Sequence, residues 1–160
     1  MGHDCRLVLA GGSADDDSEG VEVLAEVREA AGNDPDVHIL LLPPTANIEI
    51  NALQLAAAVV LQKSTREWFW LTVAEAMWKG KPVIGGETGG ITAQVIHGKT
   101  GYIVNSPEGA AFYIKHLFNN PELMAAIGRQ AKEYSRHRFL ITRQLQDYLG
   151  VMIHLSRSTR

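Results

Sequence analysis

The chain has 160 residues, of which 46% are hydrophobic and 21% charged, with a formal net charge of −3 at pH 7. That length predicts one domain with a substantial core, and the slightly acidic balance gives no reason to expect nucleic acid or an anionic membrane as a partner. The longest apolar runs, HILLLPP and LAAAVVL, are far shorter than the roughly 20 residues that a membrane-spanning helix needs.

The N-terminal residues, MGHDCRL, contain no apolar segment of the kind found in a signal peptide. They include the only cysteine of the chain, Cys5, which therefore has no partner for an internal disulfide. A lone cysteine fits a reducing compartment. These features predict a cytoplasmic protein.

Short apolar runs alternate with helical periodicity along most of the chain. Strands are predicted at residues 6–12, 37–42, 58–62, 82–84 and 101–104. Helices are predicted between them at 21–31, 47–57, 72–79 and 90–97, and then in succession at 107–118, 121–138 and 141–155. The alternation is typical of parallel βαβ units.

The predicted strands are continuously apolar, which indicates that helices cover both faces of the sheet. We therefore expect the α/β class: a doubly wound, mainly parallel, Rossmann-like sheet with helices on both faces and a helical C-terminus. Residues 1–160 are predicted to form a single domain. Ligands of such sheets bind at the carboxyl ends of the strands, beside helix N-termini.

The sequence contains no Walker A loop, no G-x-S-x-G elbow, no H-E-x-x-H and no C-x-x-C, and no metal site is predicted. Interest therefore centres on residues 63–90. Thr72 and Glu75 have the spacing of a capping box, in which each side chain binds a free helical N–H group. The same helix end could instead bind a phosphate, with Lys63 adding a positive charge and Glu75 accepting hydrogen bonds from ribose. Glycines at 85–86 and 89–90 would allow a close approach of backbone to ligand.

The segments QKSTRE, LTVAEAMWKGKPVIG, GGI and HGKTGYIV resemble the C-terminal nucleotide-binding domain of the retaining GT-B glycosyltransferases. This group includes glycogen synthase, sucrose synthase and trehalose synthase, and the sequence is most similar to the archaeal trehalose-forming type. The resemblance runs from about Leu7 to Leu149 and is strongest between Lys63 and Gly101. It implies no cofactor, and UDP-glucose or ADP-glucose as the donor substrate if the site is open.

The resemblance also implies roles for individual residues. Glu67 and Glu75 match the Glu-x7-Glu pair of the family, in which the first glutamate lies by the donor sugar and the second binds the ribose. Glu67 is therefore the catalytic candidate. Lys63 matches the lysine at the pyrophosphate, and Leu71 and Thr72 match the residues whose backbone amides reach the phosphate.

Three departures from the family pattern bear on function. Trp68 and Trp70 stand on either side of Phe69 where the family has glycines, and Leu55 stands where a charged residue is expected. The strand that precedes the one at Leu7 in the family is not found, and neither is an N-terminal acceptor domain. We expect either that the remaining strands close the gap or that a second copy fills it, as in a homo-oligomer.

Two interpretations follow. In the first, the chain is the nucleotide-sugar-binding domain of a glucosyltransferase of the trehalose synthase type and is inactive alone. In the second, it is an engineered protein-binding module on the same scaffold, because tryptophan, phenylalanine and leucine are common interface anchors. Trp68, Phe69, Trp70 and Leu55 are its interface candidates.

Overall fold

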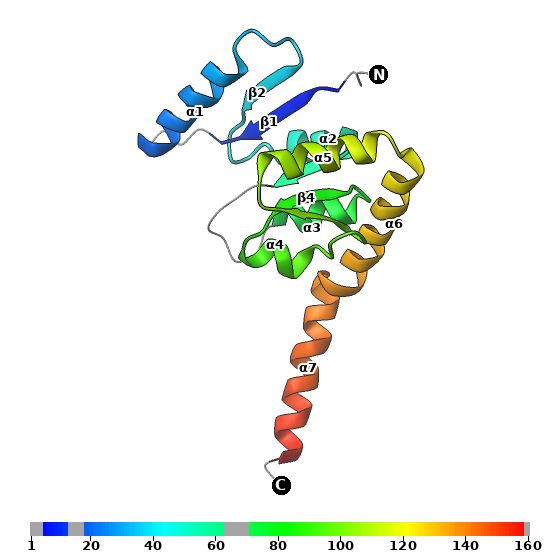
Figure 1. Cartoon of the computed structure of the whole chain (residues 1–160). Helices are drawn as coiled ribbons and strands as arrows, with labels where there is room; N and C mark the ends of the chain where they lie inside the picture. The colour runs from blue at the N-terminus through cyan, green and yellow to red at the C-terminus, as the bar shows by residue number, and fades with distance from the viewer. Residues whose placement is uncertain (1–4, 13–17, 63–70, 159–160) are drawn as a thin grey trace. The chain divides into compact units, whose positions relative to one another are not determined.

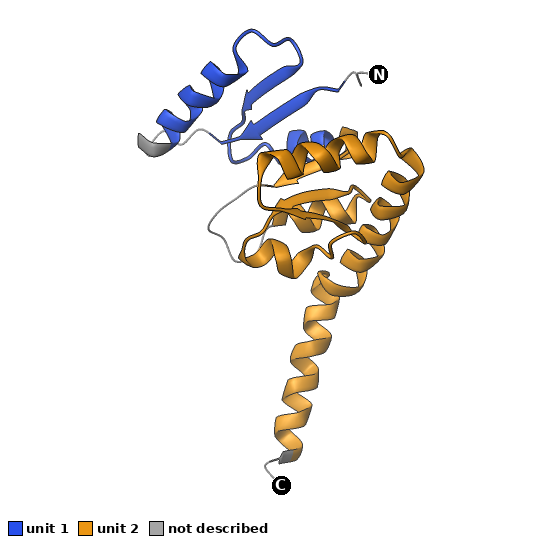
Figure 2. Ribbon diagram, viewed as in Figure 1, with its two compact units in different colours: residues 1–53 blue, residues 54–160 orange. Residues whose placement is uncertain are grey.

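The computed structural model describes residues 5–12, 18–62 and 71–158 (Figure 1). The chain divides into two compact units, residues 1–53 and 54–160, each of which is considered by itself (Figure 2). The prediction that residues 1–160 form one domain stays a prediction.

The first unit contains a parallel βαβ motif. Strand β1 (Leu7–Gly11) pairs with β2 (Val37–Leu41) along their full length, from Leu7 opposite Val37 to Gly11 opposite Leu41. Helix α1 (Ser18–Ala31) forms the connection between the two strands, as parallel pairing requires. Both strands and the helix were expected from the sequence.

The burial expected for β1 is not observed. All five of its residues are exposed, including Leu7, Val8 and Leu9, and β2 alternates between half-buried and exposed positions before ending in two exposed residues. The physical reason is the sparse packing of this unit, because α1 makes few contacts with either strand and a single helix could cover at most one face of the sheet. An apolar run thus predicted the strand correctly but not its environment.

The second unit is built on a three-stranded parallel sheet with the order β3-β4-β5. Val60 of β3 lies opposite Val83 of β4, which lies opposite Gly101 of β5. Following α2 (Asn47–Ala56), whose last residues open this unit, the elements in chain order are β3 (Val60–Gln62), α3 (Leu71–Trp78), β4 (Val83–Gly86), α4 (Gly89–Gln94), β5 (Gly101–Val104), α5 (Pro107–Phe118), α6 (Pro121–Arg138) and α7 (Ile141–Ser158).

Successive residues of the central strand face two different cores. Val83 packs with the buried residues of α3 and α4, whereas Ile84 packs with Leu117 of α5. Because side chains of a strand alternate between the faces of a sheet, helices must cover both faces of this one. Helix α6 contributes to both cores, through Ala131 and Ile127 respectively. The α/β class, the parallel strands, the helices on both faces and the helical C-terminus are confirmed.

The starts of α5 and α6 follow directly from the local sequence. Ser106 precedes α5, and its hydroxyl accepts a hydrogen bond of 3.1 Å from the N–H of Gly109. Pro107 and Pro121 are the first residues of the two helices, where a proline loses no helical hydrogen bond. Both helices begin and end at the predicted residues.

Helix α7 carries an apolar stripe on its exposed surface. Ile141, Leu145, Tyr148, Met152 and Leu155 are all exposed and recur at alternating intervals of four and three residues. This spacing places them along one side of the helix. The helix extends to Ser158, three residues beyond the predicted end.

Candidate functional site

The carboxyl ends of β3, β4 and β5 lie along one edge of the second sheet, because the three strands are parallel. Strand β3 is followed by residues 63–70 and then by the first turn of α3. Strand β4 is followed by Glu87, whose N–H group donates to the carbonyl oxygen of Val104 at the end of β5, with an N···O distance of 3.0 Å. This hydrogen bond joins the ends of neighbouring strands at the edge where the sequence predicts the ligand.

Five of the predicted site residues lie outside the described part of the chain: Lys63, Glu67, Trp68, Phe69 and Trp70. Their roles stay predictions. The described residues include the other four, of which Leu71, Thr72 and Glu75 belong to α3, and Leu55 belongs to α2. The structure therefore defines the site from the α3 side.

In the described part of the chain, α3 begins at Leu71, directly after residues 63–70, which the structure does not describe. The capping box of Thr72 and Glu75 therefore stays a prediction. In a helix that starts at Leu71, the first four N–H groups, which include those of Leu71 and Thr72, have no acceptor within the helix.

One side of α3 is buried in the core, so the residues on its opposite side point toward solvent. Val73, Ala76 and Met77 are fully buried in the core, whereas Glu75 is exposed. The hydroxyl of Ser135, on α6, donates to the carbonyl oxygen of Ala74 at 3.3 Å and ties the helix to its neighbour. The carboxylate of Glu75 therefore extends from a well-anchored helix, one turn from its N-terminus.

Glu75 takes part in a polar network that the sequence did not reveal. Its Oε2 accepts a hydrogen bond of 3.2 Å from Nε2 of Gln54, on α2. Nζ of Lys79 donates to Oε1 of the same amide at 2.5 Å. Lys79 directly follows α3, and its N–H group still bonds to the carbonyl oxygen of Glu75 at 3.0 Å, so the side chains of these residues, four apart in the sequence, lie on the same side. Gln54 is 6% exposed, whereas its neighbour Leu55 is 53% exposed.

Packing within the protein accounts for one of the predicted site glycines, Gly85, which lies in β4. A Cβ on Gly85 would lie well inside 3.0 Å of the Ile91 side chain, so α4 could not pack as it does if residue 85 carried a side chain. Gly89, the first residue of α4, has a φ of 22°. The close approach expected at Gly85 is thus made to Ile91 within the protein.

An aromatic cluster joins the start of β5 to α5. The rings of Tyr102 and Tyr113 are stacked, with centroids 4.0 Å apart, and His97 meets both edge-on. Nδ1 of His97 accepts from the N–H of Ile103 at 3.1 Å, so its Nε2 carries a proton that can be donated to the Tyr113 hydroxyl, 3.2 Å away. Burial raises the pKa of Tyr102 above its ordinary value of 10.0, and Tyr113 raises it further.

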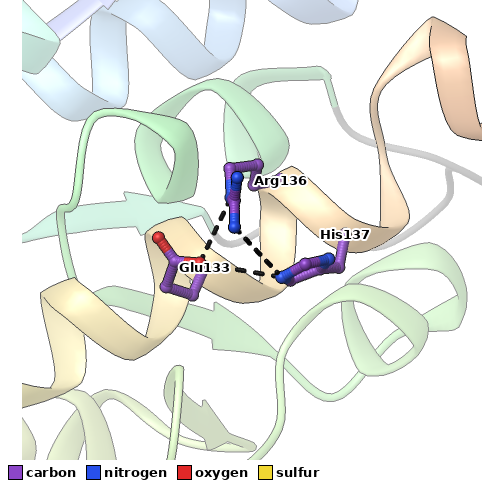
Figure 3. A network of polar contacts seen from close by, with 3 residues as sticks. All are labelled: Glu133, Arg136 and His137. Atoms are coloured by element: carbon purple, nitrogen blue, oxygen red, sulfur yellow. Dashed lines mark hydrogen bonds and ion pairs between the residues drawn. The ribbon is translucent and has the colours of Figure 1, made fainter.

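A second polar network, near the end of α6, lies on the exposed surface of the helix. Glu133 Oε2 lies 3.2 Å from Nε of Arg136 and 3.7 Å from Nε2 of His137, and all three side chains are largely exposed (Figure 3). Pairs of this kind within one exposed helix contribute little to stability. Across residues 5–12, 18–62 and 71–158, no cluster of three metal-ligating side chains is found, and no helix is long and apolar enough to cross a membrane.

Comparison with known proteins adds independent information. Residues 1–134 match the family described as glycosyl transferases group 1. The chain is 42% identical over 149 residues to the trehalose synthase of Pyrococcus horikoshii, and 42% identical over 151 residues to that of Rubrobacter xylanophilus. These alignments cover 92% and 94% of the chain but 36% of each relative, so the chain spans about a third of their length.

The fold also matches solved structures. The Anabaena protein Alr3699/HepE, crystallised in complex with UDP-glucose, superposes on 91% of this chain with a TM-score of 0.76 and 24% identity. The match covers 41% of that protein. At this level of identity the similarity establishes the fold.

Proposed function

The chain belongs to the glycosyl transferases group 1 family, and on that premise we propose that its α3 edge binds the nucleotide part of a nucleotide-activated sugar. One observation carries the proposal. The exposed carboxylate of Glu75 lies one turn from the N-terminus of α3, on a helix whose other side is fixed in the core. A helix N-terminus attracts the diphosphate, and a carboxylate accepts hydrogen bonds from ribose hydroxyls.

In this proposal each predicted residue contacts a different part of the nucleotide sugar. The N–H groups of Leu71 and Thr72 would bind a phosphate, and Glu75 would bind the ribose. Lys63 would add a positive charge at the pyrophosphate, and Glu67 would lie by the donor sugar. These assignments rest on the sequence pattern. The position of α3 gives structural support to the roles of its own residues, Leu71, Thr72 and Glu75.

The donor we propose is UDP-glucose or ADP-glucose. The similarity to two trehalose synthases supports a glucosyl donor, and the Anabaena structure supports UDP-glucose in a protein of this fold. We propose that the chain supplies the donor-binding part of a glucosyl transfer of the trehalose synthase type. The alternative of an engineered protein-binding module receives no support from these comparisons, which all point to glycosyl transfer or its structural relatives.

Calorimetric titration of the full chain with UDP-glucose and with ADP-glucose tests the proposal. Glu75→Ala should weaken the binding of the preferred donor by about tenfold or more, because a hydrogen bond to a charged group contributes about 1.5–3 kcal/mol. Glu122→Ala is the matched control, since Glu122 is also exposed and lies in the first turn of a helix, α6. Equal affinities for all three proteins would contradict the proposed role of Glu75.

A further inference from the structure

The side chain of Gln54 raises a question that the proposed nucleotide site leaves open. It is a buried amide with an exposed fraction of only 6%, at a position where the neighbouring Leu55 is exposed. Burying a polar amide is unfavourable unless both its donor and its acceptor are bonded. Gln54 meets this requirement through two charged side chains, Glu75 of α3 and Lys79 directly after it.

These two neighbours select a single orientation of the amide. The ammonium group of Lys79 can only donate hydrogen bonds, so the amide atom that faces it must be the oxygen. The carboxylate of Glu75 can only accept, so the atom that faces it must be the NH₂ group. Rotating the Gln54 amide by half a turn would place donor against donor and acceptor against acceptor. Lys79 and Glu75 therefore hold Gln54 in the same orientation.

The bond from Gln54 also restricts Glu75. A glutamate on an exposed helix surface normally samples several rotamers, and a ligand that needs one of them must overcome that entropy. Here the carboxylate is bonded to a buried group on a different helix, 21 residues earlier in the sequence. One hydrogen bond uses only part of the acceptor capacity of a carboxylate, which can accept several more.

We propose that Gln54 is a positioning residue, which holds the carboxylate of Glu75 ready to accept the ribose hydroxyls of the nucleotide. Lys79 acts one step further away, by fixing the orientation of the Gln54 amide. The inference rests on the proposed function, because it assumes that Glu75 binds ribose. Its physical content is preorganisation, in which a supporting side chain lowers the entropic cost of binding.

The test must separate positioning of Glu75 from a general effect on the fold. The native chain and its variants are titrated with UDP and with 2′,3′-dideoxyuridine diphosphate, which lacks both ribose hydroxyls, and with the matching adenosine pair. Gln54→Met keeps the size of the side chain but removes both hydrogen-bonding atoms. We expect it to weaken UDP binding by about fivefold to tenfold, which is within the cost of ordering one freed side chain on binding, and to leave the dideoxy affinity unchanged. Gln130→Met, at an exposed position of α6, is the control.

A second variant guards against a failure of Gln54→Met to fold. Lys79→Met alters a half-buried residue and should produce a smaller loss with the same ribose dependence, whereas Lys79→Arg, which can still donate to Gln54, should bind UDP almost as the native chain does. Lys115→Met, on the exposed surface of α5, is the control. Thermal unfolding of each variant shows whether the fold is retained.

The outcomes are distinguishable. If the native chain prefers UDP to its dideoxy analogue and Gln54→Met reduces that preference by about fivefold or more, positioning is supported. If the preference is unchanged in Gln54→Met and Lys79→Met, or both nucleotides lose affinity equally, this inference is overturned and the proposed function stands. If the native chain binds both nucleotides equally, Glu75 binds no ribose and this inference is overturned, although a nucleotide is still bound. If the native chain binds neither, the proposed function is overturned as well.

Discussion

Gly128, within α6, lies directly against the carbonyl oxygen of Gly80 in the turn after α3. A Cβ on Gly128 would lie well inside 3.0 Å of that oxygen, a distance that real Cβ atoms essentially never show. The absence of a side chain at one position thus allows α6 to approach the end of the helix that carries Glu75. This backbone contact helps to hold α3, and with it the candidate site, against α6.

Two glycines in helices should respond to alanine in opposite directions. Gly128→Ala should destabilise the protein by about 2 kcal/mol or more, because rigid backbone must move to admit the new methyl group. Gly150→Ala, in α7, meets no atom within 4 Å and should stabilise it by about 0.5–1 kcal/mol through helix propensity and reduced chain entropy. Urea denaturation of both variants measures the difference. Similar effects at both positions would contradict the close approach of α6 to Gly80.

Stability should fall in alkali through Tyr102. Burial raises its pKa above 10.0, so between that value and the raised one the folded state holds a proton that the unfolded state has lost. Stability due to this group is therefore complete below pH 10 and decreases as pH rises further. Tyr102→Phe should show a smaller decrease in unfolding free energy above pH 10, measured by denaturation at several pH values. Tyr148→Phe, exposed on α7, should leave the decrease unchanged.

Glycine at positions 68 and 70 should improve nucleotide binding. Trp68 and Trp70 stand where the GT-B pattern has glycines, between Glu67 and the start of α3. Bulky side chains at these positions are expected to border or occupy the place of the donor sugar. Calorimetry of Trp68→Gly with Trp70→Gly should show tighter binding of UDP-glucose than the native chain does. Tight binding by the native chain that the double substitution leaves unchanged would mean that the tryptophans do not restrict the site.

Residues 1–160 by themselves are expected not to form trehalose from a nucleotide-glucose and glucose. Glycosyl transfer requires donor and acceptor to be held together, and the chain covers 36% of the length of the trehalose synthases it resembles. A radiolabelled-glucose assay, with a full-length relative as the positive control, measures the product. Turnover at a rate comparable to that of the relative would refute this expectation.

Local signals in the sequence placed both ends of β5, α5 and α6 at the observed residues. Ser106 caps α5, the fixed φ of Pro107 and Pro121 suits the first position of a helix, and both starts are found where predicted. The strand at Gly101 was equally clear, because an apolar run follows a glycine-containing turn. These features act over a few residues and need no tertiary information.

Relationships between distant segments could not be predicted in the same way. The sequence does not distinguish Gln54 from other polar residues of its helix, because its bonds to Glu75 and Lys79 join segments that are distant in the chain. The exposure of Leu7 in β1 likewise depends on which other elements pack on that strand. The prediction that Glu75 is a site residue came from its place near the start of a predicted helix and from the family pattern. Its support by Gln54 depends on the packing of α2 and α3, which no spacing within one helix reveals.

The order of the second sheet has a consequence for how the protein forms. Its strands lie in the same order as in the chain, so each strand pairs with the one that follows it in the sequence, and no later segment has to be inserted between them. Contacts between neighbours in sequence close short loops and favour rapid folding. On the ribosome, this sheet can therefore form one strand at a time as each βα unit emerges.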